Sequence, residues 1–261
     1  MHQIELHLRG ALERQELSVL YQPLVTLASN TIHSAEALLR WHSPVLGGVS
    51  PATFIPIAEQ RGLIVPIGDW VLETALQQVS QWRSGKDPHL QVSVNVSPQQ
   101  FDQDNFVEKV QSKLAHWGLP GEALVLELTE GSLLVDLEAS NTKLAQLRGL
   151  GVQVALDDFG TGYSSLAYLR TLQVDVVKID RSFIWAMQHE GPTFVQAIVQ
   201  IAHHIGLKIV AEGIETVEQR RGVQALSCDV GQGYLFARPL APQQFGALLD
   251  QEDWASQRRT P

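Results

Sequence analysis

Residues 17–39 read LSVLYQPLVTLASNTIHSAEALL, and the topology of the whole chain depends on this stretch. It holds two apolar runs, Leu17–Val25 and Ile32–Leu39, which we predict to be β-strands. Only a few residues, from Thr26 to Thr31, separate the two runs. Because a parallel crossover needs about a dozen residues or more, we expect the pair to form an antiparallel hairpin.

Beyond the hairpin, short apolar runs alternate with segments of helical spacing. Further strands are predicted at Gln91–Val96, Leu124–Leu128, Gln153–Leu156, Asp175–Asp180, Lys208–Ala211 and Asp229–Gly233. The helical stripes, which we expect to face the core, are Val71/Ala75/Val79/Trp82, Phe106/Val110/Leu114/Trp117 and Phe194/Ile198/Ile201/Ile205. Eight strands with helices between them predict an α/β protein with a closed, TIM-like β/α barrel. The hairpin predicts that one strand of this barrel is reversed.

The composition indicates a globular chain with a sizeable core, since 44% of its residues are apolar and 18% are charged. We find no low-complexity tract or Pro/Gly/Ser-rich linker, so we expect one domain over residues 1–261, with a motif-bearing core at about 17–249. No apolar run approaches the roughly 20 residues that span a bilayer. The first residues lack the basic and apolar segments of a signal peptide.

The charge and the cysteine content exclude several classes of function. A net charge of −9 argues against binding a nucleic-acid polymer. The single cysteine, Cys228, excludes an internal disulfide framework and a multi-cysteine zinc site. We therefore expect a cytoplasmic protein.

Acidic and amide side chains gather at or near the ends of the predicted strands. In a β/α barrel the carboxyl ends of the strands converge on one face, where active sites are built. The polar residues at these positions are Glu36, Asn95, Glu127, Glu130, Asp157, Asp158, Lys178, Asp180, Glu212 and Glu215.

Carboxylates that are grouped in this way repel one another and raise each other's pKa values. Either each carboxylate has its own Arg or Lys partner, or divalent cations bind several of them together. The chain has 19 basic residues, and Lys178 alone lies among these strand ends. Mg²⁺ and Mn²⁺ prefer oxygen ligands. The pattern therefore favours a metal site, and scattered surface acids remain the alternative.

A series of short motifs runs in one order from about Leu17 to Pro239. The motifs are Tyr21-Gln22-Pro23, Glu36-Ala37-Leu38-Leu39-Arg40-Trp41, Phe54-Ile55-Pro56-Ile57-Ala58-Glu59, Asn95-Val96-Ser97, Glu127-Leu128-Thr129-Glu130, Asp157-Asp158-Phe159-Gly160-Thr161-Gly162, Lys178-Ile179-Asp180, Ala211-Glu212-Gly213-Ile214-Glu215-Thr216 and Gln232-Gly233-Tyr234-Leu235-Phe236. Each motif alone is weak, but all of them in this order resemble the EAL domain family. The resemblance implies a β/α barrel with a reversed first strand, which agrees with the hairpin argument.

The resemblance also implies an activity, namely hydrolysis of one phosphodiester bond of cyclic di-GMP, a bacterial second messenger, to linear pGpG. Two Mg²⁺ or Mn²⁺ ions would be needed. The implied ligands are Glu36, Asn95, Glu127 and Asp157 for one ion, and Asp157, Asp158 and, through water, Glu215 for the other. The implied catalytic residues are Lys178 beside the attacking water, Glu212 as general base or water orienter, and Asp158.

Substrate contacts and assembly follow from the same resemblance. The implied substrate-binding residues are Arg40 at a phosphate, and Gln22, Leu39, Gln232 and Phe236 along a guanine or the ligand backbone. Glu130 would steady the Asp157–Tyr163 loop, and this loop and Ser164–Leu169 would lie near a homodimer contact.

Family members that only sense cyclic di-GMP usually lack a metal ligand, the aspartate pair, the lysine or the glutamate base, and all of these are present here. An enzyme is therefore the favoured reading. A catalytically silent cyclic di-GMP receptor and a phosphodiesterase for another nucleotide are the alternatives.

Overall fold

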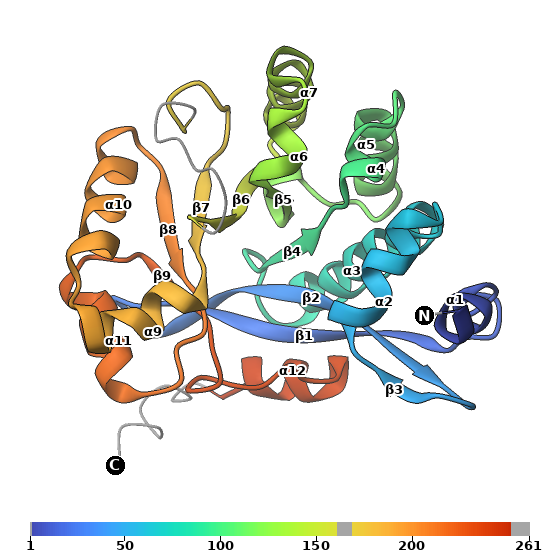
Figure 1. Ribbon diagram of the computed structural model, residues 1–261, viewed down its shortest axis with the longest axis horizontal. Coiled ribbons are helices and arrows are strands. Elements are labelled where there is room, and N and C mark those ends of the chain that lie inside the picture. Colours follow the sequence, from blue (N-terminus) through green and yellow to red (C-terminus); the bar gives the residue numbers. More distant parts are fainter. Residues whose placement is uncertain (1, 161–168, 252–261) are drawn as a thin grey trace.

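The computed structural model describes residues 2–160 and 169–251. Its centre is a sheet that closes into a barrel, with helices around the outside (Figure 1). The strands are β1 (Leu17–Thr26), β2 (Thr31–Ser43), β3 (Gly47–Val49), β4 (Gln91–Asn95), β5 (Leu124–Thr129), β6 (Gln153–Phe159), β7 (Val176–Ile179), β8 (Lys208–Ala211) and β9 (Val230–Gly231).

The strand order confirms the predicted barrel. Within the described residues it is β1-β9-β8-β7-β6-β5-β4-β2-β3, and pairing of β1 with β2 closes the first eight into a ring. β1 runs antiparallel to both of its neighbours, β2 and β9. The strands from β2 through β4 to β9 pair in parallel around the rest of the ring. The protein is a TIM-like β/α barrel with a reversed first strand.

The β1–β2 hairpin also has the predicted geometry. Leu17 pairs with Trp41 at its open end, and Thr26 pairs with Thr31 at the turn. In the turn, Asn30 has a φ of 61°. This is the left-handed region, which asparagine adopts more readily than most residues. The short connection therefore reverses the chain without a glycine.

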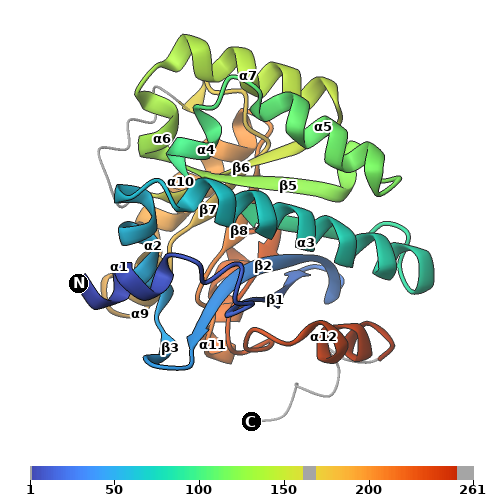
Figure 2. The same ribbon diagram turned by 90° about the vertical axis from the view of Figure 1, so that its right-hand side faces the viewer.

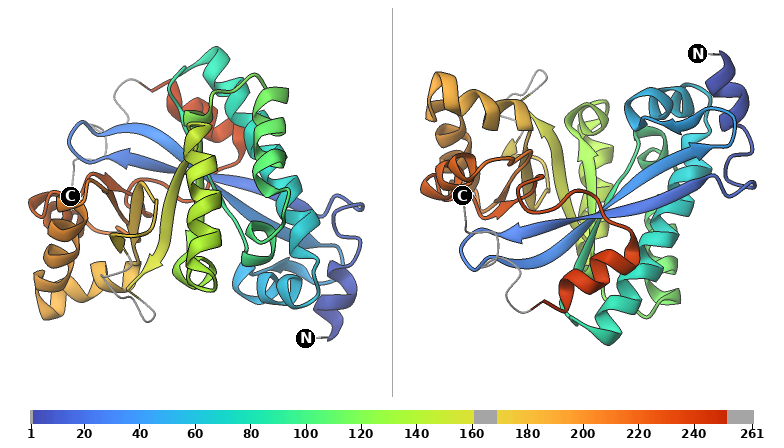
Figure 3. Two further views of the ribbon diagram at one scale, coloured as in Figure 1. Left: turned by 90° about the horizontal axis from the view of Figure 1, so that it is seen from above. Right: turned by 90° about the horizontal axis from the view of Figure 1, so that it is seen from below.

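Helices cover the outside of the barrel. They are α1 (His2–Leu8), α2 (Pro51–Gln60), α3 (Ile64–Gly85), α4 (Pro98–Phe101), α5 (Phe106–His116), the 3₁₀ turn η1 (Gly121–Ala123), α6 (Glu130–Leu134), α7 (Leu137–Gly149), α9 (Arg181–Glu190), α10 (Thr193–His204), α11 (Val217–Ala225) and α12 (Pro242–Leu249). Figure 2 shows α3, α5 and α7 side by side along the barrel. In the right-hand view of Figure 3, in which the molecule is seen from below, α12 (red) lies against β1. None of the described helices combines the length and the apolarity that crossing a bilayer requires.

Two strand boundaries differ from the sequence prediction. β2 continues to Ser43 and pairs with β3, a short strand that was not predicted. β6 continues to Phe159, so Asp157 and Asp158 lie within the end of the strand rather than at the start of the loop that follows it. A register shift against β7 accompanies this end of β6, as is usual where a bulge re-aims side chains.

The buried face of α10 was also predicted wrongly in part. Phe194 is 53% exposed, whereas the buried side chains of α10 are Val195, Ile198, Val199 and Ala202. The run from Val195 to Val199 offers apolar residues on more than one face, and packing selects a face one residue away from the predicted one. The stripe predicted on α3 is confirmed, since all four of its residues are buried.

The inside of the barrel holds its own small apolar layer. This layer is separate from the larger core between the sheet and the helices, and we call it the barrel plug: Leu24, Val125, Ala155, Val176, Val210 and Val230. Side chains alternate between the two faces of a strand. The inward residues before and after the barrel plug are therefore placed at the two ends of the barrel, and this spacing positions the site described below.

The chain after β4 is held by a close contact with α3. Ser97 caps α4: its hydroxyl accepts a hydrogen bond from the Gln100 backbone N–H at 3.3 Å, and the Gln100 side chain accepts one from the Ser97 N–H at 3.2 Å. The Gln100 amide packs directly on Gly68 of α3, where a Cβ atom would lie 2.2 Å from it. This contact fixes the segment that follows Asn95.

Gly68→Ala is therefore expected to destabilise the protein, because the new methyl group displaces Gln100 and breaks the cap of α4. The loss should be about 1–2 kcal/mol, the range of a lost helix cap, which lowers Tm by several degrees. Gly85→Ala on the same helix is the matched control, since no atom lies within 4 Å of its Cβ position. The control should be neutral or stabilising by up to about 1 kcal/mol. Thermal melts of both variants test this, and equal Tm values would contradict it.

Candidate active site

The strands bring one polar side chain each to the end of the barrel where the parallel strands finish. On β5 to β9 each lies two residues beyond the barrel plug residue of the same strand, and Gln22 lies opposite Glu36 on the reversed strand. We call this set the polar ring: Gln22 (β1), Glu36 (β2), Asn95 (β4), Glu127 (β5), Asp157 (β6), Lys178 (β7), Glu212 (after β8) and Gln232 (after β9). The structure therefore brings together residues that are as much as 210 positions apart in sequence.

Lys178 lies at the centre of the polar ring and is 1% exposed. Its Nζ lies 2.6 Å from Glu127 Oε2 and 2.7 Å from Glu212 Oε1. Asp157 Oδ1 is 3.2 Å away, and Glu36 Oε1 is 3.8 Å away. One buried cation thus serves four carboxylates, which is too little positive charge to offset them.

This imbalance changes the protonation of the buried groups. Burial, together with the negative charge of Glu36, raises the pKa of Glu127 well above its usual range. Burial acts against the charged form of Lys178, but the carboxylates around it, Asp157 first, raise its pKa well above the ordinary value. For Glu36 burial also favours the neutral form, yet Lys178 and the Gln232 amide outweigh it and lower its pKa. Without a further cation the polar ring therefore favours retention of a carboxyl proton.

Glu212 is the carboxylate of the polar ring whose pKa lies near neutral pH. Burial raises its pKa to about 7, against the opposing effect of Lys178. Asp158 shows a weaker effect of the same kind, since burial and the charge of Asp157 raise its pKa. A group with a pKa close to 7 is well suited to exchange a proton during catalysis.

Amide side chains hold Glu36 in place. Asn95 Nδ2 donates to Glu36 Oε1 at 2.8 Å, and Gln232 Nε2 donates to Glu36 Oε2 at 2.5 Å. The same Gln232 nitrogen donates to Gln22 Oε1 at 3.1 Å, and Gln22 in turn donates to the Ala237 carbonyl at 3.0 Å. The Gln232 Oε1 atom is buried and has no hydrogen-bond partner among the residues that the structure describes. A buried acceptor without a partner is costly, so it marks a place where a ligand can bind.

Asp157 and Asp158 are aimed by an unusual backbone conformation. Asp158 has a φ of 54°, and its N–H donates to Asp157 Oδ1 at 3.0 Å. Non-glycine residues rarely adopt this region, and such strain concentrates at functional sites. The result is that two consecutive carboxylates both reach Glu212, because oxygen atoms of the three lie within 4.8 Å of one another.

The residues present fit divalent metal ions. Asp157, Asp158 and Glu212 form a group that can hold an ion, and Glu36, Asn95 and Glu127 lie beside it in the polar ring. All of these donors are oxygen atoms, the ligands that Mg²⁺ and Mn²⁺ prefer. The surplus of buried negative charge around Lys178 and the unpartnered Gln232 oxygen agree with a cation bound here.

Two cavities flank the polar ring. One, of about 290 Å³, is lined by Gln22, Glu36, Glu212, Glu215 and Tyr234 among others. The other, of about 500 Å³, is lined by Leu39, Arg40, Asn95 and apolar residues of α2 and α3. Most of the predicted substrate-binding residues therefore border one of the two cavities.

Phe236 differs from the other predicted substrate contacts. Its side chain is 4% exposed and packs close to Gly231 inside the fold. Tyr234, two residues earlier, is 49% exposed and lines the smaller cavity, with the Arg238 guanidinium 4.3 Å from its ring centre. The sequence analysis did not select Tyr234, although its place in the same motif was a usable signal. A role for Phe236 in binding stays a prediction.

The remaining predicted residues lie at the edges of the site. Glu215 lines the smaller cavity, and its backbone N–H donates to Gln219 Oε1 at 2.7 Å. Glu130 is the first residue of α6. The loop that Glu130 was expected to steady, 157–163, continues into residues 161–163, which lie outside the described residues. The role of Glu130 therefore stays a prediction.

Comparisons with known proteins decide the family. The protein-family model that describes the EAL domain matches residues 5–239, which is most of the chain. This chain belongs to the EAL domain family. Its relatives include the bifunctional diguanylate cyclase/cyclic di-GMP phosphodiesterase MucR of Pseudomonas aeruginosa, which is 42% identical over 93% of this chain. The cyclic di-GMP phosphodiesterase NbdA of the same organism is 40% identical over 91% of this chain.

A solved structure agrees with this assignment. The PaMucR phosphodiesterase in complex with cyclic di-GMP superposes with a TM-score of 0.89 at 42% identity, and covers 93% of this chain and 99% of that one. The curated relatives are longer: this EAL domain spans 36% of the length of MucR and 31% of that of NbdA. The likeness therefore concerns the EAL part of those proteins.

The raised pKa of Glu212 predicts how the stability of the metal-free EAL domain varies with pH. The folded protein binds the Glu212 proton more tightly than the unfolded chain, so stability falls as the pH rises from about 4.5 to about 7. A shift of this size corresponds to about 3 kcal/mol at most. Glu212→Gln cannot ionise and should avoid the loss.

The measured quantity is the Tm of Glu212→Gln minus the Tm of the unmodified protein, both in chelator. This difference is expected to be larger at pH 7.5 than at pH 4.5. Glu13→Gln, which removes a carboxylate at an exposed position outside the polar ring, is the matched control. A Glu212→Gln difference that does not change with pH would show that this carboxylate ionises freely.

Proposed function

We propose that this EAL domain is a phosphodiesterase that hydrolyses one bond of cyclic di-GMP to give linear pGpG, and that it needs Mg²⁺ or Mn²⁺. The observation that carries the proposal is the polar ring, in which buried Lys178 contacts Glu127, Asp157 and Glu212. Relatives named as cyclic di-GMP phosphodiesterases share about 40% of the sequence. A cytoplasmic location, which cell fractionation would test, follows from the intracellular substrate.

We propose two metal positions at the polar ring. Their ligands are Glu36, Asn95, Glu127 and Asp157 for one ion, and Asp157, Asp158 and, through water, Glu215 for the other. When bound, the ions would acidify the attacking water and offset the charge of the phosphate. Asn95 contributes an oxygen without adding negative charge, so the site stays able to admit an anionic substrate.

The chain's own residues provide the remaining chemistry. Lys178 keeps its proton, so its Nζ can donate hydrogen bonds and orient the attacking water. Glu212, with a pKa raised to about 7, accepts the proton of that water. The two residues are in contact at 2.7 Å, so Lys178 also holds the Glu212 carboxylate in place. Asp158 completes the acidic face on which this water lies.

The two flanking cavities match a substrate with two similar halves. Arg40 borders the larger cavity and is half-buried, and we propose that it contacts a phosphate of cyclic di-GMP. Gln22, Gln232 and Tyr234 border the smaller cavity, where polar groups can meet a guanine edge and an aromatic ring can stack on it. The cavities lie on either side of the polar ring, and we propose that the scissile phosphodiester lies between them.

The first test is a product assay. Incubation with cyclic di-GMP and Mg²⁺ or Mn²⁺ should yield pGpG, separated by chromatography, and excess chelator should abolish the reaction. Ca²⁺ should support little turnover, because it accepts more ligands in a looser geometry. Activity that persists in chelator would contradict metal dependence.

The same assay separates the alternatives. Tight binding of cyclic di-GMP without product would indicate a receptor module. Turnover of a different cyclic dinucleotide in preference to cyclic di-GMP would contradict the proposed substrate.

The second test concerns Glu212→Gln, which removes the base but keeps size and hydrogen bonding. A positioned base contributes about 10²–10⁴-fold in rate, so kcat should fall by about that factor while calorimetric affinity for cyclic di-GMP changes little. Asp157→Asn is the comparison, because a residue shared by both ions should lose metal affinity as well as rate. A manganese titration distinguishes them: rescue of Glu212→Gln by excess Mn²⁺ would make Glu212 a metal ligand instead.

We also propose that the EAL domain forms a homodimer near the 157–169 segment. Residues 161–168 of this segment lie outside the described residues. Beside it, the Phe183 ring packs against Gly160, where a Cβ atom would lie 2.7 Å away, and stacks on exposed Phe194 at 4.8 Å. An aromatic group that is exposed on one side and touches the Asp157–Asp158 strand on the other suits a contact that affects the site. Light scattering at assay concentrations should give twice the monomer mass, and a fully active monomer would contradict the proposal.

A further inference from the structure

The larger of the two cavities beside the polar ring has a mostly apolar wall and a single acidic side chain. Ile55 of α2 and Ile64, Ile67 and Val71 of α3 form much of the wall. Glu59, in the last turn of α2, is the one carboxylate among the described residues that line this cavity. The volume of about 500 Å³ falls within the range of small-molecule sites, about 300–1,000 Å³. An apolar wall of this size suits the face of a purine base.

Nothing in the described structure stabilises the negative charge of Glu59. Within residues 2–160 and 169–251, its carboxylate forms no hydrogen bond and no ion pair. The side chain is half-buried, and this burial raises the pKa of Glu59. Its position near the C-terminal end of α2 is also unfavourable, because that end of a helix carries partial negative charge. The carboxylate is therefore a cost to the folded protein that packing does not explain.

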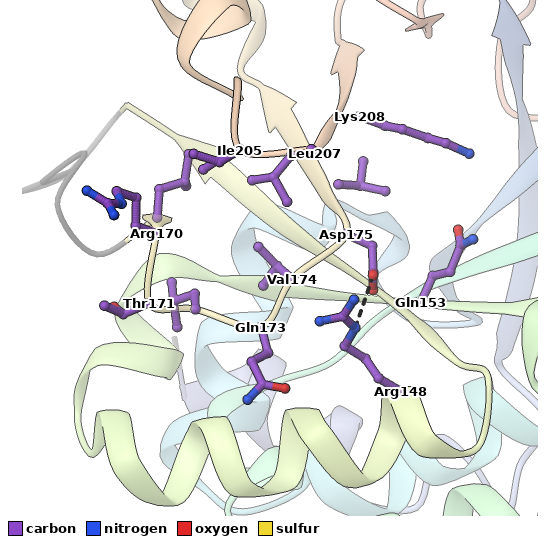
Figure 4. Close-up of a pocket in the computed structure, with 14 residues that line it drawn as sticks. Arg148, Gln153, Arg170, Thr171, Gln173, Val174, Asp175, Ile205, Leu207 and Lys208 are labelled. Carbon is purple, nitrogen blue, oxygen red and sulfur yellow. Dashed lines mark ion pairs between the residues drawn. The ribbon is translucent and has the colours of Figure 1, made fainter. Parts of the chain in front are cut away.

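Other carboxylates that line cavities have partners. Asp175 lines a cavity at the start of β6, β7 and β8, where Arg148 Nε pairs with it at 3.2 Å (Figure 4, dashed line). Asp180 borders the smaller cavity beside the polar ring and accepts the Ser182 backbone N–H at 2.9 Å. Glu59 has water alone. A ligand that fills the larger cavity displaces this water, so it must itself supply hydrogen-bond donors to the carboxylate.

We propose that Glu59 selects guanine over adenine in the larger cavity, by accepting hydrogen bonds from the N1–H and the N2 amino group of one substrate base. The inference rests on the proposed function and names the residue that reads the base. An ionised carboxylate only accepts hydrogen bonds, and its two oxygens match the two adjacent donors of guanine. Adenine presents an acceptor, N1, at the same edge, which repels a carboxylate. Arg40 borders the same cavity, so the base and the phosphate of one nucleotide unit can be held together.

The experiment is calorimetry with cyclic di-GMP and cyclic di-AMP, in Ca²⁺, which is expected to support little turnover. The measured quantity is the selectivity, defined as the Kd of cyclic di-AMP divided by the Kd of cyclic di-GMP. Glu59→Gln keeps the shape of the side chain but replaces one acceptor with a donor. Cyclic di-GMP should bind about 10- to 100-fold more weakly to it, the effect of losing a hydrogen bond to a charged group. Cyclic di-AMP should bind no more weakly, because a glutamine amide can pair with adenine.

Two further variants and a thermal melt guard against a purely structural effect. Glu59→Ala should lose affinity for cyclic di-GMP as Glu59→Gln does. Glu108→Gln, at an exposed position on α5, is the matched control and should keep the selectivity of the unmodified protein. The Tm of Glu59→Gln should equal or exceed that of the unmodified protein, because the lost carboxylate has no partner in the described structure. A marked fall in Tm would assign Glu59 a structural role and overturn the proposal.

The outcomes separate this inference from the proposed function. If cyclic di-GMP binds but Glu59→Gln weakens both ligands equally, or neither, the role of Glu59 is overturned and the proposed function stands. If the unmodified protein does not bind cyclic di-GMP at all, both are overturned. If the selectivity shifts as expected but Mg²⁺ and Mn²⁺ yield no pGpG, Glu59 reads guanine in a receptor module and only the hydrolysis is overturned.

Discussion

The contact of Lys178 with the surrounding carboxylates is the constraint on which the rest of the structure depends. Burying several carboxylates is costly unless positive charge and hydrogen bonds offset the repulsion. Lys178 is 1% exposed and lies within 4 Å of four carboxylates, so neither it nor they can leave without exposing an unpaired charge. The residual negative charge is the feature that suits the site to metal ions. The same interaction therefore holds the strand ends together and defines the chemistry.

The reversed first strand makes this arrangement possible. Because the hairpin turns the chain back at Thr26–Thr31, β2 enters the ring parallel to β4 and ends on the same side. Glu36 thus reaches the polar ring from the second strand. β1 runs the other way and offers Gln22 from its middle, a neutral residue that helps to hold Glu36 through Gln232. A hairpin of a few residues thereby provides the barrel with both a carboxylate and its support.

Sequence alone predicted the barrel and most of the polar ring, because those features depend on local signals: apolar runs, a connection too short for a crossover, and polar residues at strand ends. It did not predict features set by tertiary packing. The buried face of α10 is one residue from the predicted stripe, since several faces of that helix are apolar. The positive φ of Asp158 and the exposure of Tyr234 rather than Phe236 also depend on neighbours distant in sequence.

The barrel plug separates the two ends of the barrel. Its side chains, among them Leu24, Val125 and Val176, come from β1 and from β5 to β9. Ser34 and Ser93 are the buried residues at the corresponding positions of β2 and β4. The strands themselves are the connection: Gln153 precedes Asp157 by four residues on β6, and Lys208 precedes Glu212 by four across β8. Close-packed interiors transmit small displacements rather than absorb them. A displacement at the start of β6, β7 or β8 is therefore carried along the strand towards Asp157, Lys178 or Glu212.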